Sequence, residues 1–221
     1  MTGAARGIEV RGTEREIEAE LGRRWPEAPA AVARAKAAIE KRQLLDWQAL
    51  LLFGLTRDLK PSRILEIGTL HGFSALLMAL AAPRALLTTL NPVGAEVARA
   101  RGYLRGYANV TVVARASWDY LRTDRESYDL VFVDGDHRRV ALDLPWFQRL
   151  RLGGLMLFHD YSPIACPPVF EAVRTLSHRG TENTERNMDR REGERNGLDV
   201  VAMDDAGIGM AGLFRAADRP R

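Results

Sequence analysis

Three short stretches of the chain carry residues that can do chemistry, and each includes or follows a segment that reads as a buried strand. The stretch EIGTLHGFS (66–74) holds a carboxylate and two glycines. The stretches VDGDH (133–137) and FHDYS (158–162) combine carboxylates with histidines. Carboxylates and imidazoles bind divalent cations or accept protons, and a turn with few side chains lets a ligand approach the main chain. Together the three stretches predict a ligand site, provided that the fold brings them together.

The elements around these stretches alternate between strand-like and helix-like patterns. Near-continuous apolar strands separated by helices indicate a parallel sheet that is covered on both faces. The expected strands are 63–67, 85–90, 110–114, 128–133 and 154–158. The expected helices are 72–82, 94–107, 117–122, 138–149 and 167–178.

The two ends of the chain add to this α/β core. Residues 198–215 predict a β-hairpin with its turn at 204–207, which completes a Rossmann-like, doubly wound sheet of seven strands, mostly parallel with an antiparallel last strand. Residues 1–60 predict a helical extension before a domain at 61–221. The extension contains an amphipathic stretch closed by Pro26 and a second helix from Ala30 to Leu59. The polar, charged segment 177–197 predicts a mobile loop.

The topology predicts where the chemistry lies. In an open doubly wound sheet, ligands bind beyond the carboxyl ends of the strands, where the strand order reverses. If the first, fourth and fifth expected strands are neighbours, the three turns surround one crevice. The residues expected around it are Glu66, Asp134, Asp136, His137, His159 and Asp160.

Composition excludes several classes of partner. The net charge is +3, from 32 basic and 29 acidic residues, which is too small and too scattered an excess to predict nucleic-acid binding. The longest apolar run, 75–82, is too short to span a bilayer, and the first residues lack an apolar signal core. A single cysteine, Cys166, favours a reducing compartment. We therefore expect a cytoplasmic protein with a small-molecule substrate and with neither nucleic acid nor membrane as partner.

The glycine spacing narrows the choice of ligand. Dinucleotide-binding turns use closely spaced glycines at a helix N-terminus to hold a pyrophosphate. Here the pattern is E-x-G-x-x-x-G, with Gly68 and Gly72 four residues apart. This pattern disfavours a nicotinamide dehydrogenase, and it suits a ligand with a positive group that Glu66 attracts.

At these residues the chain resembles the class I S-adenosylmethionine-dependent methyltransferases. The resemblance covers residues 61–177 and the closing hairpin, and it rests on the motifs ILEIG, DLVFVDGDH and GGLMLFHDY. Within that superfamily the chain is similar to small-molecule O-methyltransferases with DGDH and HDY motifs, a branch that includes cephalosporin-hydroxylase-like and macrolide-sugar-methyltransferase-like proteins. The resemblance implies methyl transfer from S-adenosylmethionine to a hydroxyl of a small molecule.

The resemblance also implies which residues hold the cofactor. These are Glu66, Gly68, Thr69, Gly72, Asn91, Ser117, Trp118 and Asp134. Glu66 and the two glycines match the motif that cradles the methionine part. Asn91 stands where an acidic residue normally binds the ribose, so the charge-assisted hydrogen bond is lost there. Ala116, Ser117 and Trp118 stand where an acidic residue often lies beside the adenine, and we expect Trp118 to lie against the adenine face.

A divalent cation is the second implied cofactor. Asp134 and Asp160 match the magnesium-binding turns of some branch members, and His159 replaces a second acidic ligand. Mg²⁺ prefers oxygen ligands, whereas a histidine favours a metal such as manganese, iron or zinc. A bound cation lowers the pKa of a hydroxyl group, and either Asp136 or His137 then takes the proton. The sequence leaves the choice between these two bases open.

Each functional interpretation has a structural alternative. The glycines also suit a tight strand-to-helix turn, and Asp134 and Asp136 also suit a helix N-cap. Asn91 also suits a turn, and Trp118 also suits the core. For the whole chain, the alternative is a non-catalytic binding or scaffold protein on the methyltransferase fold. We expect the N-terminal helices to cover the substrate side or to form a homodimer contact.

Overall fold

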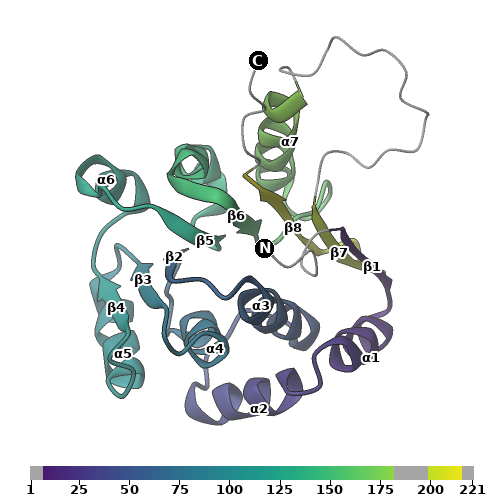
Figure 1. Cartoon of the computed structure of the whole chain (residues 1–221), viewed down its shortest axis with the longest axis horizontal. Helices are drawn as coiled ribbons and strands as arrows, with labels where there is room; N and C mark the ends of the chain where they lie inside the picture. Colours follow the sequence, from purple (N-terminus) through teal and green to yellow (C-terminus); the bar gives the residue numbers. More distant parts are fainter. Residues whose placement is uncertain (1–6, 182–198, 216–221) are drawn as a thin grey trace.

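The computed structural model of the chain describes residues 7–181 and 199–215. Its strands are β1 (Ile8–Gly12), β2 (Arg63–Ile67), β3 (Leu86–Leu90), β4 (Val110–Val113), β5 (Tyr128–Val133), β6 (Leu150–Phe158), β7 (Val200–Asp204) and β8 (Gly209–Phe214). Its helices are α1 (Glu14–Arg24), α2 (Ala28–Ala38), α3 (Asp46–Leu59), α4 (Phe73–Ala81), α5 (Gly94–Leu104), α6 (Ser117–Thr123) and α7 (Pro167–Thr181), with two short 3₁₀ helices, η2 (His137–Leu142) and η3 (Leu144–Arg149). Figure 1 shows α1 to α5 on one side of the sheet, and α6 and α7 on the other.

The sheet has the order β1-β7-β8-β6-β5-β2-β3-β4. Only β8 runs antiparallel to its neighbours, β6 and β7. The five predicted parallel strands and the predicted C-terminal hairpin are therefore confirmed. The strand order reverses between β2 and β5, because the chain leaves β2 toward β3 and leaves β5 toward β6.

The prediction of seven strands was one strand short, because β1 lies in the N-terminal extension. It pairs in parallel with β7, with Ile8 opposite Val200. Ile8 and Val10 are buried, while Glu9 and Arg11 between and beyond them are exposed. The alternating stretch is only five residues long and its partner lies about 190 positions away. Such a short stretch is a weak local signal, so the strand forms only because the folded sheet offers it an edge.

The helix predicted from Ala30 to Leu59 is two helices, α2 and α3. Residues 39–45 connect them, and Ile39 and Leu44 in this connection are buried in the core. Lys36 Nζ lies 2.8 and 2.6 Å from the two carboxylate oxygens of Asp46 and so joins the end of α2 to the start of α3. The apolar residues of this connection are buried in the core, so the apolar pattern continues from α2 into α3. For this reason the sequence predicted one helix instead of two.

Two other boundaries differ from the predictions. The helix predicted at 138–149 is the pair η2 and η3, which meet at Asp143 just before Pro145. Helix α7 extends to Thr181, so residues 177–181 of the predicted mobile loop are helical. The rest of that loop, 182–197, lies outside the described residues. None of the described helices is both long and apolar enough to cross a membrane.

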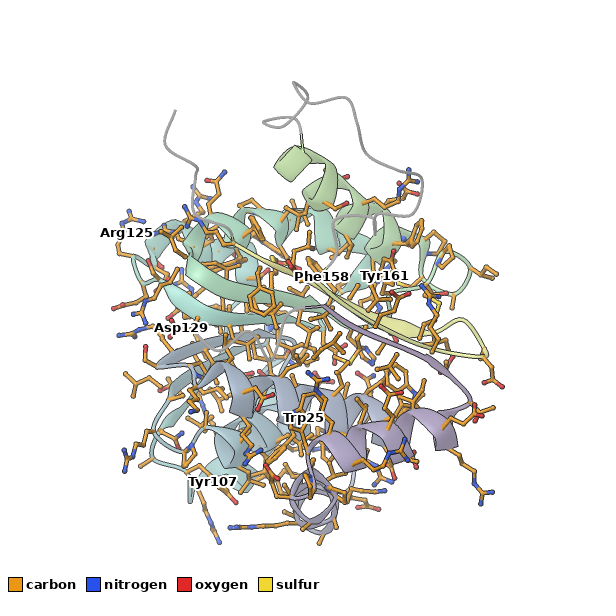
Figure 2. The ribbon with its side chains drawn as sticks, turned by 45° about the vertical axis from the view of Figure 1, so that its right-hand side comes forward. Trp25, Tyr107, Arg125, Asp129, Phe158 and Tyr161 are labelled. Atoms are coloured by element: carbon orange, nitrogen blue, oxygen red, sulfur yellow. The ribbon has the colours of Figure 1, made fainter. Side chains whose placement is uncertain are left out.

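Alternation along the central strands divides the core into two layers. On β2, Ile64 packs with the layer of α1 to α5, whereas Leu65 and Ile67 pack with the layer that contains α7. Figure 2 shows Trp25 and Phe158, which belong to these two opposite layers. The same alternation turns the side chain of Glu66 toward α4.

Candidate functional site

The strands that carry the three chemical turns are neighbours and end at one level. Ile67 of β2 pairs with Val133 of β5, and Val133 pairs with Phe158 of β6. Just beyond these pairs, the Asp134 amide donates to Ile67 O at 2.8 Å and the His159 amide donates to Val133 O at 3.0 Å. The expected adjacency of the three strands is confirmed. The first residues of all three turns therefore lie side by side at the carboxyl edge of the sheet.

Packing between two of these turns requires glycine at position 68. Gly68 has a φ of +105°, and a Cβ there would lie 2.0 Å from the carbonyl oxygen of Asp134. Gly72 has a φ of +91°, and a Cβ there would meet the flexible side chain of Leu104 at 2.7 Å. Leu70 between them adopts a φ of 45°, which is uncommon for a residue with a side chain. Contact with the next strand thus explains Gly68 before any ligand is considered.

Glu66 is a fully buried carboxyl group with two hydroxyl partners. Its oxygens accept hydrogen bonds from Ser74 on α4 and from Thr89 on β3. Burial raises its pKa to about 7, although both hydroxyl groups act to lower it. The hydroxyl of Thr69 lies 2.5 Å from that of Thr89, so the Thr69 side chain faces this buried network. The group is therefore held in one place and lies close to its midpoint of ionisation at neutral pH.

A second cluster lies at the ends of β5 and β6. One ligand atom each from Asp134, His137 and His159 lies within 4.8 Å of the others. His159 Nδ1 is 3.0 Å from Asp134 Oδ1 and 3.3 Å from Asp160 Oδ1. His137 Nε2 is 3.7 Å from Asp134 Oδ1, and its Nδ1 is 3.5 Å from Asp160 Oδ2. Of the three predicted metal ligands, the structure thus brings Asp134 and His159 together with His137, while Asp160 lies beside both histidines.

The charges of this cluster depend on one another. Burial of His159 opposes its protonation, but the carboxylates of Asp134 and Asp160 outweigh burial and raise its pKa to about 10. Burial of Asp134 acts to raise its pKa, but His159 and His137 outweigh that effect and lower it. Without a cation the cluster is a carboxylate–imidazolium pair. A divalent cation in the same place would replace the proton, because metal ions and protons compete for imidazole and carboxylate.

The donor set fits a divalent cation. His159 Nδ1 and His137 Nε2 are buried atoms that make no hydrogen bond within the described part of the chain. Both face a carboxylate, and imidazole nitrogens with a carboxylate oxygen are ordinary ligands of divalent transition metals. Asp134, His137 and His159 are therefore the residues that could hold a metal here, with Asp160 beside the two imidazoles.

Asp136 is a helix cap in the structure. Its side chain accepts from the Arg138 amide at the start of η2, and it pairs with the guanidinium groups of Arg138 and Arg139. The hydrogen bond from the Arg138 side chain is the main reason that the pKa of Asp136 is lowered. A lowered pKa makes a carboxylate a weaker base. The cap proposed as the structural alternative is therefore present.

Asn91 forms a turn and also holds a carboxylate. Its Oδ1 accepts from the Val93 amide at 2.8 Å, and its Nδ2 donates to Glu96 Oε2 at 2.8 Å. Glu96 lies in the first turn of α5, and its side chain is brought to the carboxyl end of β3. Sequence reasoning missed Glu96. An acidic residue in the helix turn after Asn-Pro was the signal that could have found it.

Ser117 and Trp118 open helix α6 at the end of β4. The Ser117 hydroxyl donates to the carboxylate of Asp143, a buried residue that sequence reasoning also missed. Burial raises the pKa of Asp143 to about 6. Trp118 is half-buried and belongs to neither core layer of the described residues, and the Arg139 guanidinium lies 5.4 Å from its ring centre. Ala116 is the buried N-cap residue of α6.

The third residue that sequence reasoning missed is Gln48, which comes from the N-terminal extension. It is buried on α3, and its Oε1 lies 3.0 Å from His159 Nε2. The same Oε1 accepts from the Leu45 amide at 2.8 Å. No local pattern signals this contact, since the two side chains are 111 positions apart.

Comparison with known proteins finds similarity to methyltransferases. A family model described as a methyltransferase domain matches residues 65–161. The chain is 35% identical over 141 residues to a catechol O-methyltransferase of Mycobacterium tuberculosis (strain ATCC 25618 / H37Rv), a match that covers 61% of this chain and 64% of that protein. The chain thus spans less than two thirds of that relative's length.

Solved structures of other proteins share the fold of this chain. The Podospora anserina methyltransferase PaMTH1, solved with S-adenosylhomocysteine bound, has a TM-score of 0.66 at 19% identity, over 92% of this chain and 95% of that one. The cofactor-bound protein Rv0187 of M. tuberculosis has a TM-score of 0.62 at 27% identity, over 91% of this chain and 97% of that one. The fold therefore extends through nearly all of the chain, including the N-terminal extension.

Proposed function

We propose that the chain is a class I, S-adenosylmethionine-dependent methyltransferase that transfers a methyl group from this cofactor to a hydroxyl group of a small molecule, with a divalent cation bound beside the substrate. The matched methyltransferase domain at residues 65–161 and the catechol O-methyltransferase relative support this proposal. One observation carries the proposal. The glycine turn after β2 and the Asp134 cluster after β5 lie side by side where the strand order reverses. Ligands of open α/β sheets bind at that point.

We assign the cofactor to the turns after β2, β3 and β4. S-adenosylmethionine, when bound, supplies an electrophilic sulfonium methyl group. Glu66 offers a negative charge to the methionine end, since its pKa of about 7 leaves it easily ionised by a nearby cation. Gly68 and Gly72 let this turn adopt positive φ angles, and Gly68 lets it pack against Asp134.

The ribose and adenine sites are the finer part of this proposal. Glu96, held by Asn91, would supply the carboxylate that position 91 lacks. A carboxylate accepts both hydroxyl groups of a diol more strongly than an amide does. Trp118 would form the wall beside the adenine, because its ring is half-buried and lies outside the two core layers of the described residues. Ser117 would shape this site through its bond to Asp143.

The cation would lie at the Asp134 cluster. A divalent cation, when bound, lowers the pKa of a hydroxyl group beside it, so that the hydroxyl ionises without a strong base. Of the two predicted bases, Asp136 is occupied by Arg138 and Arg139 and is the weaker candidate. His137 lies in the proposed cation site, and both of its ring nitrogens face carboxylates of the cluster, so it would serve there as a ligand rather than as the base.

The substrate class follows from the cation. Asp134, His137 and His159 would hold the cation, and a cation there would favour a substrate with two adjacent hydroxyl groups, one of which accepts the methyl group as S-adenosylhomocysteine leaves. The catechol O-methyltransferase relative also supports a substrate with adjacent hydroxyl groups. Catechols are therefore the first substrates to test.

Two measurements test the proposal. Calorimetric titration with S-adenosylhomocysteine should show a Kd below about 100 μM, or roughly −5.5 kcal/mol. Incubation with methyl-labelled cofactor, a catechol panel and Mg²⁺ or Mn²⁺ should give a labelled product that EDTA abolishes. A chain that shows no heat and no thermal shift at millimolar ligand is instead a non-catalytic protein on this fold. Binding without transfer to any hydroxyl acceptor would refute the methyltransferase activity but not the cofactor site.

A further inference from the structure

We infer that Asp134, His137 and His159 form a centre for a transition-metal dication, and that Gln48 and Asp160 orient its two imidazole rings. This inference rests on the proposed function only for the use of the metal in methyl transfer. Binding of the metal itself can be measured without any reaction.

The two histidines each direct a free nitrogen at the same carboxylate. His159 Nδ1 and His137 Nε2 are buried and make no hydrogen bond with any described residue, yet they lie 3.0 and 3.7 Å from Asp134 Oδ1. Without a cation, these contacts are ion pairs that do not reach hydrogen-bond geometry. A cation between the two rings and Asp134 would give both nitrogens a partner.

The hydrogen bonds of Gln48 identify which nitrogen of His159 carries the lone pair when the ring is neutral. The Leu45 amide can only donate, so the atom it meets at 2.8 Å is the side-chain oxygen of Gln48. That oxygen can only accept, so His159 Nε2, 3.0 Å away, carries a proton. In the neutral ring the lone pair is then on Nδ1, which faces Asp134. Gln48 therefore selects the tautomer that a metal ligand needs.

Asp160 has the corresponding position beside His137. Its Oδ2 faces His137 Nδ1 at 3.5 Å, opposite the nitrogen that faces Asp134. Metal-bound histidines usually donate their other N–H to a carboxylate or carbonyl oxygen, which fixes the ring. Asp160 adopts a φ of 53°, an uncommon conformation that places its carboxylate near both rings. The two imidazoles thus have one outer partner each, Gln48 and Asp160.

The donor types decide the class of metal. Mg²⁺ prefers oxygen ligands and keeps several waters, whereas two imidazoles with one carboxylate favour Mn²⁺, Fe²⁺, Co²⁺ or Zn²⁺. Gln48 lies on α3, so the centre also depends on the N-terminal extension. A metal that reaches this site would tie the extension to the ends of β5 and β6.

Cobalt titration of the full chain, after treatment with chelator, tests the centre. We expect one Co²⁺ per chain, with visible absorption bands that a large excess of Mg²⁺ leaves in place. His137→Gln and His159→Gln should each weaken Co²⁺ binding by at least about tenfold. Displacement of Co²⁺ by Mg²⁺, or wild-type affinity in the His137 variant, would overturn the assignment.

A matched set of variants on α3 tests whether Gln48 positions the His159 ring. Gln48→Met removes the acceptor and should weaken Co²⁺ binding roughly 10–100-fold, whereas Gln48→Glu keeps an acceptor and should restore most of the affinity. Asp46→Asn breaks the Lys36 contact at the same helix end, away from His159, and should leave the Co²⁺ affinity unchanged. Equal weakening by Gln48→Met and Asp46→Asn would mean that only the helix end matters, and would refute the positioning role.

Titration of the same samples with S-adenosylhomocysteine separates this inference from the proposed function. Binding of S-adenosylhomocysteine without Co²⁺ binding would refute the metal centre and leave the cofactor site intact. Binding of Co²⁺ without binding of S-adenosylhomocysteine would refute the cofactor site and leave the metal centre intact. Gln48→Met should leave the affinity for S-adenosylhomocysteine unchanged, since Gln48 contacts the β6 side of the edge.

Discussion

At the carboxyl ends of β2, β3 and β4 the polar side chains satisfy one another, whereas at the ends of β5 and β6 two buried ring nitrogens have no hydrogen-bond partner among the described residues. On the first side, the partner pairs are Glu66 with Ser74 and Thr89, Asn91 with Glu96, and Ser117 with Asp143. On the second side, His137 and His159 face carboxylates without forming a hydrogen bond through these nitrogens.

The difference indicates two ways in which side chains can be arranged before a ligand binds. A closed hydrogen-bond network fixes Glu66, and a ligand then meets an already ordered surface. In the second cluster a cation would replace a proton between the imidazoles and the carboxylates, so binding of the metal and order of the two rings become coupled. Disrupting each side separately should therefore have different consequences.

The largest effect is expected where the two sides touch. Gly68→Ala would place a Cβ 2.0 Å from the Asp134 carbonyl at a φ of +105°, so it should lower the free energy of unfolding by about 3 kcal/mol. Gly94→Ala is the control, because a Cβ there meets no atom within 4 Å, and thermal denaturation should show little change. A Gly68→Ala variant as stable as the wild type would mean that the two turns are farther apart than described.

Removal of the Glu66 carboxyl group, at the ends of β2 to β4, should strongly weaken cofactor binding. Glu66→Ala leaves the hydroxyls of Ser74 and Thr89 without their buried partner and removes the proposed contact, so S-adenosylhomocysteine affinity should fall roughly 100-fold, about 2.7 kcal/mol. Asp129→Asn disrupts a carboxylate at the opposite end of β5, where it binds Ser62 and Arg151, and is the matched control. Equal loss in both variants, measured by calorimetry, would point to general destabilisation.

The raised pKa of Glu66 predicts that cofactor binding depends on pH. The pKa of Glu66 is raised to about 7, so its carboxyl group becomes charged as the pH rises through 7. S-adenosylmethionine carries a positive sulfonium and S-adenosylhomocysteine does not. The affinity ratio of the first ligand to the second should therefore increase severalfold between pH 6 and 8, by about 1 kcal/mol. Calorimetry of Glu66→Gln should show a ratio that does not change with pH.

The smallest effect is expected at the end of β3. Asn91→Ala removes the bonds to Val93 and Glu96, so the affinity for S-adenosylhomocysteine should fall about fivefold, near 1 kcal/mol. Glu96→Gln should have a similar effect if Glu96 is the ribose ligand. Asn109→Ala, which loses a bond to Ala85 O at the amino end of the sheet, should leave the affinity unchanged. An unaffected Glu96→Gln variant would limit Asn91 to a turn-forming role.

Much of the central fold could be predicted from the chain. The strands 63–67 and 128–133 were predicted to the residue, because each is a compact apolar run bounded by turn residues. The site was partly predictable for the same reason: polar residues directly after parallel strands must meet at one edge. Glu66, Asp134, His159 and Asp160 were placed at this edge in this way, and their roles stay predictions. The break between α2 and α3 was not, because Ile39 and Leu44 continue the apolar pattern through a connection that is not helical.

Sequence periodicity determined the α/β class, the parallel sheet and the edge where the chemistry gathers, since these depend on local patterns of apolar and polar residues. Only the tertiary structure decided that β1 joins the sheet, that Gly68 makes room for Asp134, and that Gln48 meets His159. Each of these contacts joins residues more than 60 positions apart. Such contacts depend on distances of a few ångströms that packing sets, and no pattern along the chain encodes them locally.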